Sequence, residues 1–404
     1  MIHPPAKKVA KEAVVLKPSS VSVPLKQNCG NAPSPVVKEG EKVKRYQKIA
    51  EAKRDLSVPL HAPIAGTITH ISDRIIIDSE GAAEVKPKKK DYTRLSAEKI
   101  IDVIKEAGIV GMGGAAFPTY AKLKTKVKTY ILNGCECEPQ LTADHHVMVT
   151  YPKEVITGLR ILMKATGAEK GIIGIEKNKP DAIKELKKYT DETIEVKAVP
   201  TRYPQGAEKM LIHTLTKRKV PCGDLPCAVD IGMNNVSTAK AVYDAFQGKP
   251  LTERFVTVTG SVKKQCNVLA PIGSSARDLI NQADGYESQP IKIIFGGPMM
   301  GIAQDSVENP ITKSTSGVII FSHEDIRQEE PCIRCGFCVQ ACPMQLMPTL
   351  LAKLIKNRKF ADAKDNNLLD CFECGSCAYV CPSNIPLTHY FRLGKKELKD
   401  AQEK

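Results

Sequence analysis

The chain contains no tryptophan, and aromatic residues make up only 5% of its 404 residues. It has no apolar run of the ~18 residues that a membrane-spanning helix needs. The N-terminal segment MIHPPAKKVAKEAVVL lacks the long apolar stretch of a secretory signal. We therefore expect neither a membrane span nor export. An apolar content of 42% is enough for buried cores, and the length predicts roughly two to four domains.

The chain has fewer acidic than basic residues, with a net charge of +14. The excess of lysine and arginine is spread along the chain, apart from the run KPKKK at 86–90. Basic surfaces bind nucleic acid, anionic membranes or acidic proteins. The chain has no recognised nucleic-acid-binding module and few aromatic residues to stack on bases, so we expect no nucleic-acid partner. A docking surface for an acidic electron carrier or for a membrane complex remains, as does a lysine-rich surface without a partner.

Cysteine is abundant, with fourteen residues. Without a secretory signal, cysteines predict metal or cofactor ligands better than disulfides. Residues 332–343 (CIRCGFCVQACP) and 371–382 (CFECGSCAYVCP) both follow the pattern C-x2-C-x2-C-x3-C-P, which is typical of 4Fe–4S clusters. Zinc would need only four ligands and has no use for the repeated third cysteine.

In such paired runs, the fourth cysteine of each run ligates the other cluster. The predicted ligands of the first cluster are Cys332, Cys335, Cys338 and Cys381, and those of the second are Cys371, Cys374, Cys377 and Cys342. The remaining cysteines, among them Cys135, Cys137, Cys222 and Cys227, are interpreted as free thiols. A third metal centre at Cys135 and Cys137 is the alternative.

The stretch GIVGMGGAAFP at 108–118 matches the dinucleotide-binding fingerprint G-x-G-x-x-G/A. That fingerprint requires a strand before the glycines and a helix after them. Here Ile100, Val103 and Ile104 recur at helical spacing before the loop. A helix therefore enters the loop, and the glycines do not form a Rossmann turn.

The chain as a whole is predicted to be a multidomain α/β protein. Residues 1–95 resemble the lipoyl-carrier β-sandwich, 96–249 form an α/β domain, 250–325 resemble the SLBB β-grasp family, and 326–404 form a helical domain with the two clusters. Lys53, at the expected hairpin tip, does not match the turn that carries a lipoyl group. We therefore expect the first domain to have a structural or docking role.

The motifs GMGGAAFPTYAKL, NGCECEP, YPQGAEKMLI and NNVST, in that order, resemble the flavoprotein subunit of respiratory complex I. That family binds FMN and NADH. Together with the domains on either side and the paired cysteine runs, the chain from about residue 20 to 390 resembles the RnfC family of the Rnf complex. The Rnf complex is an ion-translocating membrane oxidoreductase that links ferredoxin to NAD.

The resemblance implies that FMN and NAD(H) are bound by one set of residues in the α/β domain. These are Gly111, Gly113, Gly114, Phe117, Lys122, Asn133, Glu136, Glu138, Gly206, Glu208, Asn234, Asn235 and Thr238. The glycines would approach the FMN phosphate and the nicotinamide cofactor. Phe117 would pack against a cofactor ring system, and Lys122 would lie near the FMN phosphate. The asparagines and glutamates would surround the flavin and the nicotinamide ribose.

The chain also departs from the complex I pattern at Ala116, which stands in place of Gly, and at four positions where that family has a polar side chain. Met112 stands in place of Arg, Cys135 in place of Asp, and Ala207 and Ser237 each in place of Glu. Each of these four changes removes a polar group that the family offers to its nucleotides. A fold that is retained without flavin binding is therefore an alternative.

The implied function is electron transfer between NAD(H), FMN, two 4Fe–4S clusters and a partner, with no catalytic acid or base. The expected partners are the other Rnf subunits and, indirectly, ferredoxin, at the cytoplasmic face of the bacterial inner membrane. A cobalamin reductase of bacterial microcompartments and a flavin-free iron–sulfur relay are the alternatives. The regular second cysteine run favours Rnf over the reductase, and the clusters exclude the sodium-pumping quinone reductase subunit of similar fold.

Overall fold

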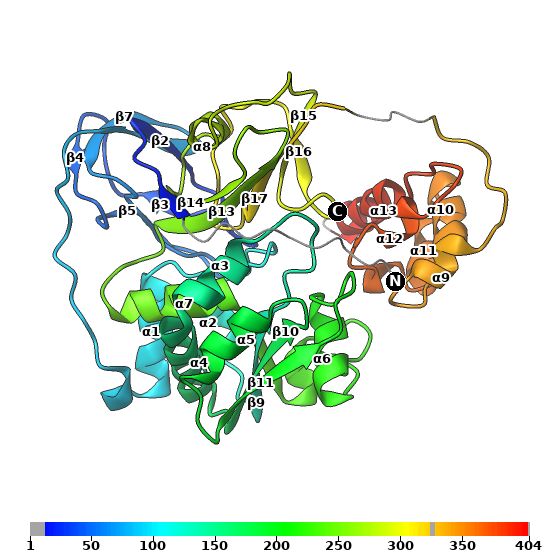
Figure 1. The fold of residues 1–404 in the computed structure, drawn as a ribbon, viewed down its shortest axis with the longest axis horizontal. Coiled ribbons are helices and arrows are strands. Elements are labelled where there is room, and N and C mark those ends of the chain that lie inside the picture. Colours follow the sequence, from blue (N-terminus) through cyan, green and yellow to red (C-terminus); the bar gives the residue numbers. More distant parts are fainter. Residues whose placement is uncertain (1–12, 324–327, 403–404) are drawn as a thin grey trace.

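The computed structural model describes residues 13–323 and 328–402 (Figure 1). The segment 1–12, expected not to be a signal, and the expected boundary at 325–326 lie outside the described residues. Within the part that is described, no helix is both long enough and apolar enough to cross a membrane. Two β-rich regions lie side by side above an α/β region, and the C-terminal helices form a separate group (Figure 1). The four domain bounds given above remain a proposal.

The first β-rich region is a sandwich of two sheets that enclose an aliphatic core. Its four-stranded sheet has the order β2 (Ser20–Pro24), β8 (Arg74–Ser79), β7 (Gly66–Ile71) and β4 (Lys42–Val43). Its three-stranded sheet has the order β3 (Ser34–Pro35), β5 (Lys48–Glu51) and β6 (Leu60–His61). In β2 the buried residues Val21 and Val23 alternate with more exposed serines, as expected for a strand with one face in a core.

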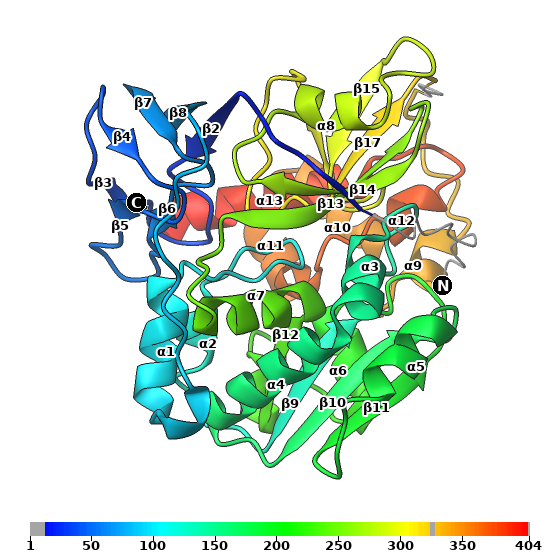
Figure 2. The ribbon, with the colours of Figure 1, turned by 60° about the vertical axis from the view of Figure 1, so that its left-hand side comes forward.

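The α/β region is built around a parallel sheet of order β11-β10-β9-β12. The strands are β9 (Thr129–Gly134), β10 (Lys170–Glu176), β11 (Ile194–Val199) and β12 (Ile231–Asn235). The helices are η1 (Tyr92–Arg94), α1 (Ala97–Glu106), α2 (Thr119–Lys122), α3 (Ala143–Thr150), α4 (Pro152–Thr166), α5 (Pro180–Lys187), α6 (Glu208–Thr216), η2 (Pro226–Val229) and α7 (Val236–Phe246). Helices α4 and α7 pack on one face of the sheet and α6 on the other (Figure 2). Helices on both faces of a parallel sheet make a three-layer α/β arrangement, and an α/β domain is what the sequence predicts here.

Helix α1 enters the glycine loop, as its apolar spacing predicts. Ser96 caps its N-terminus by accepting a hydrogen bond from the Lys99 N–H, and Ile100, Val103 and Ile104 face the core. The helix ends before Gly108, whose φ of +68° lies in the left-handed region. The rejection of a Rossmann turn is therefore confirmed.

The second β-rich region is a six-stranded sheet with one helix packed on it. In order across the sheet its strands are β1 (Ala13–Val15), β14 (Cys266–Pro271), β13 (Glu253–Gly260), β17 (Gly317–Phe321), β15 (Lys292–Phe295) and β16 (Ile302–Gln304). Helix α8 (Ala276–Gln282) begins with a capping box between Ser275 and Asp278. Strand β1 pairs in parallel with β14, so this sheet takes its edge strand from residues far upstream.

The C-terminal region is helical, as expected. Its elements are α9 (Phe337–Ala341), α10 (Pro348–Lys356), α11 (Phe360–Asp365), η3 (Leu368–Asp370), α12 (Ser376–Tyr379) and α13 (Leu387–Gln402). Helix α13 packs across α10 and α11 around Leu351, Ile355 and Phe391. Helices α10 and α11 lie between the two cysteine runs, and they hold the two cysteine loops in one unit.

Candidate functional site

The predicted flavin residues gather at the carboxyl ends of the parallel strands. After β9 the chain adds β10 and β11 on one side, and β12 then pairs with β9 on the other side. The order of strands therefore reverses between β9 and β12. Ligands of open α/β sheets bind outside the carboxyl ends of strands at such a switch point. Asn133 at the end of β9 and Asn235 at the end of β12 are register partners there.

The glycine loop lies against the start of α7 beside this switch point. The Gly111 N–H donates to the Phe117 carbonyl at 2.8 Å, and the Met112 N–H donates to Oγ1 of Thr238 at 2.9 Å. A Cβ added to Gly113 would lie 3.4 Å from Cβ of Asn235, whereas one added to Gly114 would have no atom within 4 Å. The loop is thus anchored on one side and open on the other, which fits a cradle for a phosphate or a ring.

Two departures from the complex I pattern have visible consequences in this loop. Ala116 stands where that pattern has glycine, and its φ is +48°, in the left-handed region that favours glycine. Met112, in place of Arg, is buried in the core. Buried Arg254 of β13 places its guanidinium near the same loop, 3.5 Å from the Met112 carbonyl. Burial lowers the pKa of Arg254 to about 10, with Asp144 opposing the shift.

The asparagines of the site are held in fixed orientations by neighbours, two of which no sequence motif singles out. The Tyr130 hydroxyl donates to Oδ1 of Asn234 at 2.6 Å, and Nδ2 of Asn235 donates to Oδ2 of Asp144 at 2.6 Å. Asn133 donates through Nδ2 to the Gly206 carbonyl at 2.7 Å. Tyr130 and Asp144 therefore support the site indirectly, through the side chains that they orient.

We expect Tyr130→Phe to weaken FMN binding several-fold and to lower stability by about 1 kcal/mol. The change removes one buried hydrogen bond and leaves the Asn234 carbonyl oxygen without its donor. The measurements are an FMN titration of the apoprotein and a thermal melt. Tyr189→Phe, on an exposed ring, is the matched control. Unchanged FMN affinity in Tyr130→Phe would mean that the Asn234 amide does not meet the flavin.

The two carboxylates of NGCECEP contact backbone N–H groups of other segments. Glu136 accepts from the N–H of Asp144 at 2.9 Å and of His145 at 3.3 Å, at the N-terminus of α3. Glu138 accepts from the N–H groups of Met299 and Met300 in the GGPMMG turn. Both side chains lie in the loop that follows β9, and Glu138 connects that loop to the six-stranded sheet region.

The YPQGAE segment lies close to the same loop. An added Cβ at Gly206 would lie 2.4 Å from the Cys135 carbonyl, so this position needs glycine. Nζ of Lys122 lies 3.1 Å from a carboxylate oxygen of Glu208. The predicted residues from four separate segments are therefore neighbours in space. Phe117 is half-buried beside them.

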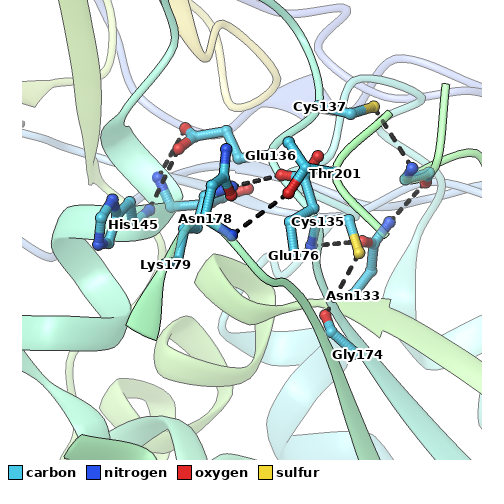
Figure 3. Close-up of polar contacts among 12 residues, drawn as sticks. Asn133, Cys135, Glu136, Cys137, His145, Gly174, Glu176, Asn178, Lys179 and Thr201 are labelled. Atoms are coloured by element: carbon cyan, nitrogen blue, oxygen red, sulfur yellow. Dashed lines mark hydrogen bonds and ion pairs between the residues drawn. The ribbon is translucent and has the colours of Figure 1, made fainter. Parts of the chain in front are cut away.

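A buried ion pair that no motif of the sequence predicts lies beside this group. Glu176 and Lys179 form it at the carboxyl end of β10, and both side chains are almost fully buried. Figure 3 shows the pair next to Cys135, whose thiol donates to the Gly174 carbonyl at 3.5 Å. Burial, then the charge of Glu176, raise the pKa of Cys135 well above its ordinary value. Cys135 is thus a neutral buried thiol. In the sequence, the charged run EKNK directly after an apolar strand is the feature that could have indicated the Glu176–Lys179 ion pair.

The two cysteine loops have equivalent local geometry. Gly336 and Gly375 both adopt φ +77°, and each begins a short helix that carries the third cysteine of its run. Burial, followed by the nearby thiols of Cys371, Cys374 and Cys342, raises the pKa of Cys377 to about 12. Burial also raises the pKa of Cys338, and the nearby thiols of Cys381 and Cys335 add to that shift. Each of these two thiols thus has a neighbour from the other run, as the crossed pattern requires, and the two 4Fe–4S ligand sets stay a prediction.

Four family models match successive parts of the chain. A barrel-sandwich hybrid domain of RnfC matches residues 2–86, and the Nuo51 FMN-binding domain of complex I matches 104–244. An SLBB domain matches 255–303, and a 4Fe–4S dicluster domain matches 331–385. The predicted fold class is therefore confirmed, region by region.

Curated relatives match over nearly the whole chain. The chain is 42% identical to a subunit of the proton-translocating ferredoxin:NAD(+) oxidoreductase complex of Clostridium ljungdahlii, over 96% of this chain and 90% of the relative. It is 39% identical to the corresponding subunit of the Na(+)-translocating ferredoxin:NAD(+) oxidoreductase complex of Acetobacterium woodii, over 98% and 96% of the two chains.

Among solved structures, an NAD+-reducing NiFe-hydrogenase in its H2-reduced state superimposes with a TM-score of 0.53 at 18% identity. The match covers 76% of this chain and 61% of the hydrogenase chain. At this identity the likeness concerns the fold alone.

Proposed function

This chain belongs to the RnfC family, which supplies one subunit of the ion-translocating ferredoxin:NAD(+) oxidoreductases, and we propose that it exchanges electrons with NAD(H) and passes them along its two clusters. The observation that carries this proposal is the meeting of the glycine loop with Asn235 and Thr238 at the switch point of the parallel sheet. Four separate motifs of one flavoprotein pattern meet there.

The chain has an FMN-binding domain and a 4Fe–4S dicluster domain. Gly114 would offer the open side of the loop to FMN, and Lys122 would neutralise the FMN phosphate. Bound FMN would take two electrons from NADH together and release them singly, because each cluster carries one. The protein supplies placement for this chemistry and no acid or base. Oxidation of one NADH yields NAD+, one proton and two electrons, enough to reduce two clusters.

We also propose a site of action and partners. As a subunit of a membrane complex with several subunits, the chain would lie peripherally at the cytoplasmic face of the inner membrane, against the other Rnf subunits. Its net charge of +14 suits acidic partner surfaces. Ferredoxin would be reached through those subunits.

The test uses the full chain, reconstituted anaerobically with iron, sulfide and FMN. We expect a flavin absorbance band that bleaches when NADH is added, followed by reduction of the clusters. Bound clusters without flavin and without a response to NADH would reject the proposal and leave a flavin-free relay.

Lys122→Met should weaken FMN binding roughly 10- to 100-fold, the effect of losing a charge-assisted contact of about 1.5–3 kcal/mol. Nζ of Lys122 lies 3.1 Å from a carboxylate oxygen of Glu208 and 3.5 Å from the Met233 carbonyl. Iron content should not change, because the cysteine loops are elsewhere. Lys124→Met removes the same charge from an exposed position two residues away and serves as the control. Equal FMN affinity in the two variants would contradict the assignment.

A further inference from the structure

The loop of the second cysteine run is buried where three regions of the chain meet. Cys137, Tyr203 and Cys374 form a small buried cluster, and Met299 and Phe372 pack against it. We call these five residues the junction. Its members come from the loop after β9, the YPQGAE segment, the GGPMMG turn and the second cysteine run. Lys209 of α6 adds an ion pair with Asp370 at 3.3 Å, one residue before Cys371.

Tyr203 makes the direct polar contact across the junction. Its side chain is 1% exposed, and its hydroxyl donates to the carbonyl of Cys374 at 2.7 Å. Cys374 is one of the predicted ligands of the second cluster. A residue of the flavin-binding region therefore donates a hydrogen bond to the backbone of a cluster ligand.

Glu138 fixes a second contact at the junction. Its two carboxylate oxygens accept from the N–H groups of Met299 and Met300, at 3.0 and 2.9 Å. An added Cβ at Gly297 would lie 2.2 Å from Oε2 of Glu138, so only glycine admits the carboxylate. The Met299 carbonyl in turn lies against the cluster loop, 2.9 Å from the position of a Cβ at Gly375. Glu138 thereby holds the GGPMMG turn between its own loop and the second cysteine run.

Among the described residues, the first cysteine run is not packed against other regions of the chain in the way that the second run is. Cys332 and Cys335 are exposed, and Ile333 and Phe337 between and beside them are 68% and 52% exposed. Cys374 and Cys377, by contrast, are buried. The second run therefore faces the flavin-binding region, and the first faces outward.

We propose that Tyr203 is a positioning residue that holds the second cluster loop against the flavin-binding region. Glu138 and the GGPMMG turn hold the same loop from the six-stranded sheet region. This rests on the proposed function, which gives the docked cluster the task of exchanging electrons with the flavin side. With the cluster bound, each exchange would move one electron from the donor to the cluster, and the reverse would hold for NAD+ reduction. The O–H dipole of Tyr203 points its positive end toward the loop that carries Cys374, so it would stabilise the added negative charge of a reduced cluster there.

The test is a mediated redox titration of the holoprotein, followed by electron paramagnetic resonance and performed without NADH. In Tyr203→Phe the second cluster should become harder to reduce, with the reduced-to-oxidised ratio at a fixed potential falling roughly three- to tenfold, as for loss of one hydrogen bond. The first cluster and the FMN and iron contents should not change. Tyr390→Phe is the control, because its hydroxyl donates to Glu329 in the same helical region but outside the junction.

Glu138→Gln gives an independent measurement, namely amide hydrogen exchange of the holoprotein. Exchange should become faster at Met299 and Met300 and in residues 371–377, with no change in α10. Unaltered potentials in Tyr203→Phe, or unaltered exchange in residues 371–377 of Glu138→Gln, would overturn the proposal. Because neither measurement uses NADH, a protein that does not respond to NADH would reject the proposed function without affecting these results.

Discussion

Cys342→Ser should remove the cluster that is ligated mainly by the other cysteine run, and with it roughly half of the iron, since each cluster holds four irons. Cys342 follows α9, which packs against α12 of the second run. Its thiol is among those that surround Cys377, together with Cys371 and Cys374. Serine keeps the shape of the side chain but is a poor ligand for iron compared with a thiolate.

The paramagnetic resonance spectrum of the reduced protein identifies which cluster is lost. In the crossed arrangement, Cys342→Ser should leave the same residual signal as Cys377→Ser, and Cys381→Ser should match Cys338→Ser. Cys29→Ser, at an exposed thiol outside both runs, should keep both signals. If Cys342→Ser matched Cys338→Ser instead, each run would ligate its own cluster and the crossed assignment would be wrong.

Lys313→Met should abolish a rise in stability that we expect of the unchanged protein between about pH 7 and pH 10. Lys313 is 1% exposed, and its Nζ donates to the carbonyls of Gly108 at 2.7 Å and Pro59 at 3.3 Å. It therefore joins the sandwich region and the end of α1 to its own region. Burial lowers its pKa from 10.5 to about 7.

The direction of the pH effect follows from proton binding. Between about pH 7 and 10.5 the unfolded chain keeps a proton on Lys313 that the folded chain has released, so stability rises with pH in this window, by at most about 1.4 kcal/mol per pH unit. The neighbouring His61, whose pKa burial and the charge of Lys313 lower to about 3, acts only at lower pH. Methionine cannot titrate, so the stability of the Lys313→Met variant should not rise with pH in this window through this residue.

The measurement compares thermal melts of the two proteins at pH 7, 8 and 9. Lys53→Met removes an exposed lysine and should keep the slope of the unchanged protein. The difference between Lys313→Met and the unchanged protein cancels the contributions of other titrating groups. Parallel pH profiles would show that Lys313 is not buried in its uncharged form.

Several features of this protein could be predicted from the sequence because their information is local. The cysteine runs place all their ligands within twelve residues each, and the spacing alone identifies 4Fe–4S chemistry. The periodicity of residues 100–107 predicts α1 and excludes a Rossmann turn. The order of four short motifs identifies the flavoprotein pattern, and the family comparison bears out that resemblance.

The tertiary structure alone decided how those parts meet. Glu138 contacts a turn 161 residues further on, Tyr203 reaches Cys374 across 171 residues, and Arg254 approaches Met112 across 142. No periodicity or spacing encodes such pairs, because they arise from the packing of whole sheets and helices. The sequence by itself therefore determined the kinds of cofactor site and their ligand types. Only packing decided that the second cluster loop is buried against the flavin-binding region while the first is exposed, because burial depends on long-range contacts that local patterns do not carry.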